Sequence, residues 1–71
     1  MKLREAVEGV EYKIKSFSID DEELKSFLFS LGCYEGENIT VINKISGGCI
    51  VVIKDARYSF NKRLRDAIEI E

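Results

Sequence analysis

The sequence of 71 residues contains no histidine, no proline and no tryptophan, and only two cysteines. Without histidine, the chain lacks the commonest general base of enzymes and the commonest protein ligand of transition metals. Cys33 and Cys49 form no Cys-x-x-Cys pair, so we expect two buried, reduced thiols rather than a disulfide or a metal site. No set of carboxylates has the spacing of metal ligands. The sequence therefore predicts neither a bound metal nor a cofactor.

Motifs for catalysis and for phosphate binding are also missing. The chain has no Ser/His/Asp or Cys/His set, no Walker motif and no GxGxxG loop. The one glycine pair, Gly47-Gly48, is typical of a hairpin turn and is too short to cradle a phosphate. We therefore expect no catalytic residues and no enzymatic activity.

Long hydrophobic runs are absent as well. The longest one, Cys49–Ile53, is far shorter than the ~20 apolar residues of a membrane span. The opening residues, Met1–Glu5, lack the apolar segment of a signal peptide. We expect a single domain over residues 1–71, located in the cytoplasm.

The stretch Asp20–Gly36 carries the signals of a helix. Asp20 is expected to cap it by accepting a hydrogen bond from the N–H of Glu23. Gly32 is expected at the left-handed position after the helix, and Gly36 is a second permissive site before the next strand. One apolar stripe runs along the helix at i, i+3, i+4 and i+7: Leu24, Phe27, Leu28 and Leu31. We expect the strands to pack on this stripe, with the helix as the centre of the fold.

The rest of the chain reads as short strands joined by tight turns. Val10–Phe17 alternates with period two, and its apolar residues change parity near Ser16, which predicts a bulge or bend there. Asn61 is expected to cap one brief helical turn that contains Leu64. The other expected elements are a short helical segment at Leu3–Glu8, strands at Asn38–Ile45, Cys49–Ile53, Tyr58–Phe60 and Ala67–Ile70, and turns at Ser46–Gly48 and Asp55–Ala56. This order predicts a mainly β fold, a small closed barrel with one inserted α-helix and a short C-terminal helical turn.

The spacing of these residues resembles that of the FeoA family, whose members are small ferrous iron transport proteins. The resemblance covers nearly the whole chain and includes a Leu-Gly-x-x-x-Gly core at Leu31–Gly36. The residues that match the family pattern are Leu3, Ala6, Gly9, Ile14, Phe17, Leu24, Leu28, Leu31, Gly32, Cys33, Gly36, Ile39, Val41, Tyr58, Phe60, Ile68 and Ile70. The resemblance implies an SH3-like barrel and a small cytoplasmic accessory protein of bacterial ferrous iron uptake. It also implies action through binding to the FeoB transporter, which would be the chain's only link to the membrane.

Aromatic residues on and after the helix are the candidate contacts for a partner. At about 100° per residue, Phe29 points about 150° away from the centre of the apolar stripe, so it is expected on the polar face. Tyr34 follows in the loop between Gly32 and Gly36, and Phe27 adds an aromatic at the edge of the stripe. Exposed aromatics often mark interfaces, although a loop could instead cover Phe29 and Tyr34 could be a rim residue of the barrel.

Charge is unevenly distributed and leaves a second function open. Residues 20–37 carry six acids and one base, while residues 54–65 carry five bases and one acid. Such patches could steer a docking partner, or they could be two solvated faces. The basic stretch is the sole support for a nucleic-acid-binding module, which the acidic overall composition disfavours. A receptor for proline-rich peptides is disfavoured because such grooves usually contain tryptophan.

Overall fold

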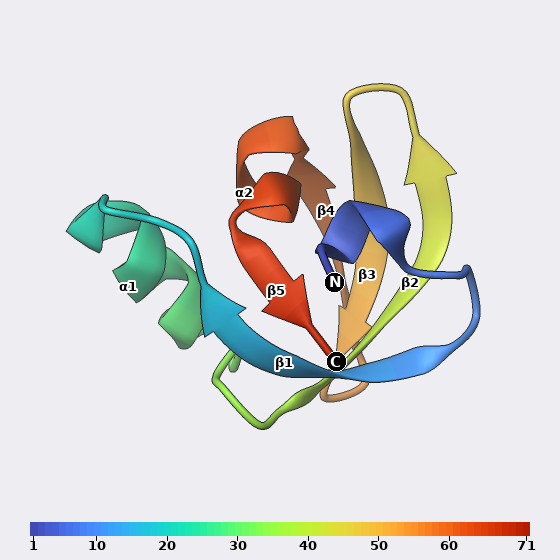
Figure 1. Ribbon diagram of the computed structural model, residues 1–71, viewed down its shortest axis with the longest axis horizontal. Coiled ribbons are helices and arrows are strands. Elements are labelled where there is room, and N and C mark those ends of the chain that lie inside the picture. Colours follow the sequence, from blue (N-terminus) through green and yellow to red (C-terminus); the bar gives the residue numbers. More distant parts are fainter.

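The computed structural model describes all residues, 1–71, and shows a mainly β domain with two short α-helices (Figure 1). Its longest axis measures 29 Å. The elements, in chain order, are η1 (Leu3–Glu5), β1 (Glu11–Phe17), α1 (Glu22–Ser30), β2 (Asn38–Ile45), β3 (Gly48–Ile53), β4 (Ala56–Asn61), α2 (Lys62–Asp66) and β5 (Ile68–Ile70). No helix is long and apolar enough to cross a membrane.

The five strands form one antiparallel sheet in the order β4-β3-β2-β1-β5. β1 pairs with β2 through its first half and with β5 through its second half. The register shifts between Ile14 and Ser16, which confirms the predicted irregularity near Ser16. This bend lets one strand serve two neighbours, as strands at barrel corners do.

The expectation of a closed barrel is wrong in one respect, because no ladder joins β4 to β5. The chain crosses from β4 to β5 through α2, which packs against β3, β4, η1 and β5 and covers this side (Figure 1). Asn61 caps α2 as predicted, its side chain accepting a hydrogen bond from the N–H of Leu64 at 2.9 Å. The fold is therefore an SH3-like, curled sheet whose edge strands β4 and β5 do not pair. The helix α2 covers the gap between them.

One hydrophobic core fills the interior of the curled sheet. The strands supply most of it, and η1, α1, α2 and the segments that flank the helices supply the rest. Its buried members are Leu3, Ala6, Ile14, Leu28, Cys33, Ile39, Val41, Cys49, Val51, Ile53, Phe60, Leu64, Ile68 and Ile70. α1 contributes only one fully buried residue, Leu28. The prediction that the strands are organised around the helix is therefore wrong, since the strands pack mainly on one another.

Hydrogen bonds define both ends of α1. Asp21, one residue later than the expected Asp20, is the N-cap, and its Oδ1 accepts from the N–H groups of Glu23 and Leu24. At the other end, Gly32 has φ +85° and donates to the carbonyl of Phe29, while the N–H of Cys33 donates to the carbonyl of Leu28. This pair of bonds is the Schellman motif, and it confirms the predicted helix end.

Two further boundaries differ from the sequence predictions. The β3–β4 turn is centred on Lys54 and Asp55, not on Asp55-Ala56, and both residues have positive φ, +50° and +66°. Positive φ at both positions is the backbone of a type I′ hairpin turn, which usually selects Asn-Gly or Asp-Gly. Lys54-Asp55 is neither, so the sequence signal for this turn is weak. The N-terminal helical segment is also shorter than Leu3–Glu8 and ends at Glu5.

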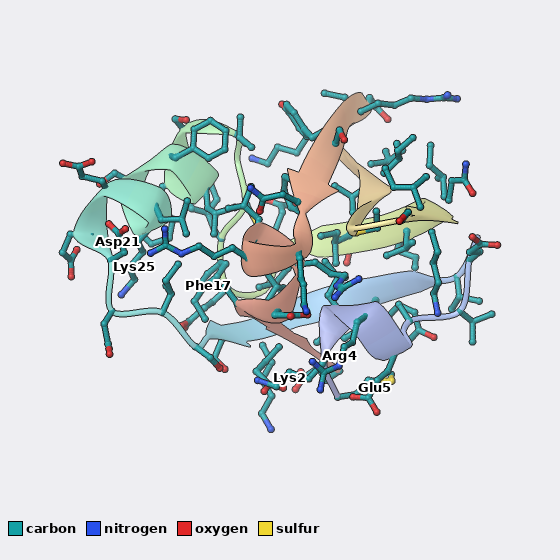
Figure 2. The ribbon with its side chains drawn as sticks, turned by 90° about the horizontal axis from the view of Figure 1, so that it is seen from above. Lys2, Arg4, Glu5, Phe17, Asp21 and Lys25 are labelled. Carbon is teal, nitrogen blue, oxygen red and sulfur yellow. The ribbon has the colours of Figure 1, made fainter.

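The N-terminal residues lie against the last strand, β5. Lys2 forms an isolated bridge with Glu69, and its Nζ lies 2.8 Å from a carboxylate oxygen of the same residue. The backbone N–H of Lys2 is held by Glu5 at 2.7 Å. Figure 2 shows Lys2, Arg4 and Glu5 together on this side, well away from Asp21 and Lys25 on α1. The N-terminal segment and the start of α1 thus form separate parts of the charged surface.

Candidate functional site

Three aromatic residues from different segments meet beside α1. The ring of Phe29 on α1 lies 6.0 Å from that of Phe17 in an edge-to-face arrangement, and 5.7 Å from that of Tyr34. Phe17 stands at the end of β1 that faces α1 (Figure 2). We call Phe17, Phe29 and Tyr34 the aromatic cluster. Phe29 and Tyr34 remain 39% and 45% exposed, so the cluster presents aromatic surface to solvent.

Lys54 completes one edge of this cluster. Its Nζ lies 5.4 Å from the centroid of the Tyr34 ring and 3.3 Å from a carboxylate oxygen of Glu37. A cation over an exposed aromatic ring contributes about 0.5–1 kcal/mol. Lys54 reaches this position from the β3–β4 turn, where its backbone has φ +50°. The turn and the loop after α1 are therefore connected through one side chain.

Phe17 and Lys54 were not among the residues expected at the site. Phe17 is the last residue of a strand with alternating apolar residues, a pattern that predicts a core position. In the structure Phe17 is half-buried and its ring contacts that of Phe29. Lys54 lies twenty residues beyond Tyr34 in the sequence. Only the pairing of β3 with β4 and the loop after α1 brings them together, so no local pattern indicates their contact.

The helical phase differs from the one that the apolar stripe indicated. Leu28 is buried, whereas Leu24 and Leu31 are half-buried and Phe27 is 47% exposed. The buried direction therefore passes through Leu28, and Phe27 and Phe29 each lie about 100° to one side of it. Phe29 is on a flank of α1 rather than opposite the buried face, and Phe27 is exposed rather than packed in the stripe.

The structure thus brings together two of the three predicted contact residues. Phe29 and Tyr34 share the aromatic cluster, but Phe27 lies on the other flank of α1 and joins no aromatic pair. Gly32 and Gly36 both have positive φ, +85° and +88°, and they fix the loop that carries Tyr34. This loop is also tied to β1, because the N–H of Gly36 donates to the carbonyl of Ile14 at 2.7 Å.

Most charges of the basic stretch are neutralised within the domain. Arg63 bonds to Asp21 at 3.0 Å, Arg65 to Asp66 at 3.0 Å, and Lys54 pairs with Glu37. Of the five bases at residues 54–65, only Arg57 and Lys62 have no ion pair. Fewer of the acidic residues at positions 20–37 are neutralised by ion pairs. Four of them form no ion pair: Asp20, Glu22, Glu23 and Glu35.

The largest hollow lies between the start of α1 and α2. It is an open groove of about 740 Å³, and the Arg63–Asp21 ion pair belongs to its lining. The remaining lining residues are Ser18, Ile19, Asp20, Lys62, Asp66 and Ala67. Because Asp21 also caps α1 and Asp66 binds Arg65, the groove is lined largely by charges that already have partners.

Neither the acids nor the thiols gather into a metal site. No group of three or more Cys, Asp or Glu side chains is placed to hold an ion. Cys33 and Cys49 are buried and unpaired, as predicted. Burial, with a smaller contribution from the nearby Glu37 carboxylate, raises the pKa of the Cys33 thiol to about 12, and burial also raises the pKa of Cys49. Both thiols are therefore protonated at neutral pH and suit packing better than metal binding.

Comparison with known proteins assigns the family. A family model described as the FeoA domain matches residues 1–71. The chain belongs to the FeoA family. The solution structure of iron(II) transport protein A from Clostridium thermocellum is 32% identical, with a TM-score of 0.87. It matches all of this chain, which spans 44% of the length of that protein.

Two further solved structures share the fold. The crystal structure of an iron uptake regulatory protein (FeoA) is 20% identical, with a TM-score of 0.86, and the match covers 99% of this chain and 93% of that one. The crystal structure of ScaR with bound Cd²⁺ is 19% identical, with a TM-score of 0.84, and the match covers this chain fully and 34% of that one. No curated protein sequence matches the chain. The FeoA fold thus occurs both in a chain of similar length and within longer proteins.

Proposed function

We propose that this FeoA domain is an accessory protein of ferrous iron uptake that acts by binding the cytoplasmic side of a FeoB-type transporter. Family membership supports a role in ferrous iron uptake. The names of two structural neighbours, iron uptake regulatory protein and iron(II) transport protein A, point the same way. A cytoplasmic location, attachment to the membrane only through the partner and the absence of enzymatic activity belong to the same proposal.

The observation that carries the interaction is the exposed part of the aromatic cluster. Phe29 and Tyr34 are held in contact by Phe17, Lys54 and the loop between Gly32 and Gly36, yet they remain accessible. Aromatic anchors of this kind dominate the binding energy of many protein interfaces. Because their positions are set before binding, little side-chain entropy would be lost on docking.

A domain without catalytic groups can influence a transporter only through differential binding. If it binds one conformation of the transporter more tightly than another, it shifts the population toward that conformation. By the same coupling, a change that shifts the transporter between these conformations also changes its affinity for the domain. In this proposal, regulation of transport follows from binding alone.

The proposal is tested by measuring the affinity of the purified FeoB cytoplasmic part for the wild-type domain, Phe29→Ala and Ile45→Ala. Ile45 is a matched control, since it is 41% exposed on the β2–β3 hairpin, away from α1 (Figure 1). We expect Phe29→Ala to weaken binding by about tenfold or more and Ile45→Ala to leave it unchanged. No measurable binding by the wild type would refute the proposal.

The second candidate, nucleic-acid binding, receives less support. A nucleic-acid surface needs basic side chains free to contact phosphates. In this domain three of the five bases at residues 54–65 are already paired with acids. Titration with labelled oligonucleotides at low and high salt tests this alternative, and we expect no salt-dependent binding.

A further inference from the structure

We propose that α1 itself is the inserted element, and that it enters an apolar groove of the partner lined at one end by basic residues. The inference rests on the proposed function and states how the surface is used. Phe27 and Phe29 are both exposed, yet they lie on opposite flanks of α1. A flat contact on the aromatic cluster would leave Phe27 in solvent. A groove that receives the helix reaches both flanks.

The position of α1 permits such insertion. It lies at one end of the molecule's longest axis, apart from the curled sheet, in both views (Figures 1 and 2). Only Leu28 anchors it fully in the core. Its two ends are nevertheless fixed, by the Asp21 cap with its Arg63 pair and by the bonds around Gly32. The helix is therefore both prominent and well defined.

Small residues form the outermost ridge of α1. Ser26 and Ser30 lie one turn apart on the side of the helix turned away from Leu28, and Ser30 is exposed. Ser30 Oγ donates to the carbonyl of Phe27 at 2.6 Å, so this hydroxyl is satisfied within the helix. A ridge of serines lets the floor of a groove approach the helix closely, while Phe27 and Phe29 contact its two walls.

Charge identifies the chemistry at the end of the groove. Glu22 and Glu23 occupy the exposed first turn of α1, and neither has an ion pair. Lysine or arginine side chains on the partner would complement them. An anionic membrane surface would repel these two glutamates, because such a surface attracts basic segments. The partner is therefore a protein with an apolar, basic-rimmed groove and not a lipid surface.

The decisive experiment compares four variants of the full chain in binding to the purified FeoB cytoplasmic part. Groove insertion predicts that Phe27→Ala and Phe29→Ala each weaken binding by about tenfold, because each contacts one wall. It also predicts that Ser26→Tyr, which adds bulk to the ridge, weakens binding by at least as much. Ser59→Tyr is the matched control, since Ser59 is an exposed serine on β4. Thermal melting of each variant verifies that the fold is retained.

The charge component has its own pair of variants. Glu22→Gln/Glu23→Gln should weaken binding several-fold and reduce its salt dependence, whereas Glu11→Gln/Glu71→Gln should change neither. Glu11 and Glu71 are also exposed and unpaired, and the change in net charge is the same.

The outcomes separate this inference from the proposed function. Binding that is lost in Phe29→Ala but retained in Phe27→Ala and Ser26→Tyr overturns groove insertion and leaves the docking function intact. Absence of binding by the wild type overturns both. Binding to phosphatidylserine-containing vesicles, or a homodimer that Phe27→Ala dissociates, would also overturn the assignment of the partner. If Ser26→Tyr does not fold, the Phe27→Ala result decides alone.

Discussion

The side chain of Lys54 lies directly over Gly32, so that a β-carbon on Gly32 would stand 3.1 Å from Cδ of Lys54. The same lysine continues to the ring of Tyr34 and to Glu37. The absence of a side chain at position 32 thus serves two purposes. It allows the left-handed backbone that ends α1, and it leaves room for the residue that links the β3–β4 turn to the aromatic cluster.

Gly32→Ala is expected to destabilise the domain by about 1–2 kcal/mol, because an L-residue resists φ +85°. Gly36→Ala is the matched control for backbone strain, since Gly36 has φ +88° and nothing within 4 Å of a β-carbon. Any additional loss in Gly32→Ala measures the displacement of Lys54. Urea denaturation of both variants provides the comparison. A Gly32→Ala protein as stable as the parent would contradict the assigned role of this glycine.

Leu28→Ala should cost about 2–5 kcal/mol in free energy of unfolding, since it leaves a cavity at the one point where α1 enters the core. Phe27→Ala removes a larger side chain from the adjacent position of the same helix, yet it should stay within about 0.5 kcal/mol, as surface substitutions do. Denaturant titration of the two variants tests the helical phase. Equal losses would show that Leu28 does not mark the buried side of α1.

The folding stability of the domain should fall in acid, because three carboxylates that stabilise the fold become protonated. Backbone hydrogen bonds from Leu24 and Glu23, with Arg63, lower the pKa of Asp21 below 3.8, and Arg65 does the same for Asp66. Lys2 lowers the pKa of Glu69 below 4.5. A carboxylate whose pKa is lower in the folded state than in the unfolded state stabilises the fold. This stabilisation is complete when the pH is above the unfolded-state pKa, and it is lost as the pH falls through the folded-state pKa.

We therefore expect these groups to leave the urea midpoint constant above about pH 5 and to lower it below about pH 4. Glu69→Gln should weaken this acid dependence, because the variant has no carboxylate to protonate. Glu71→Gln is the control, as Glu71 is exposed and forms no ion pair. Identical pH profiles for the parent and Glu69→Gln would exclude a contribution from the Lys2–Glu69 pair.

Iron should leave the isolated domain unchanged, because its carboxylates and protonated thiols offer no group of three ligands. A metal at 100 times its Kd stabilises a fold by about 2.7 kcal/mol. In a domain of this size such a gain raises the Tm by on the order of 10 °C. Anaerobic Fe²⁺ titration followed by thermal melting should show no shift. A saturable increase that a chelator reverses would establish a site.

Several local elements of this domain follow from its sequence. The helix end at Gly32, the cap at Asn61 and the bulge near Ser16 each depend on a few neighbouring residues, and all three are confirmed. The spacing of the apolar residues also indicated the FeoA family, which the comparison confirms. Such features are predictable because backbone preference, capping and side-chain alternation act over only a few positions.

The placement of α1 was decided by the tertiary structure. Four residues form a regular stripe in the sequence: Leu24, Phe27, Leu28 and Leu31. The curled sheet fills its own interior, so only Leu28 is fully buried, while Leu24 and Leu31 pack against the core half-buried. The cluster of Phe17, Phe29 and Tyr34 with Lys54 depends on contacts between distant segments, which no local pattern encodes. The sequence alone indicated a helix that ends at Gly32, although it placed the N-cap at Asp20 and the structure has it at Asp21. The packing of the strands determined how far it is buried and which of its phenylalanines meet other aromatic rings, because burial depends on the space that the other elements leave.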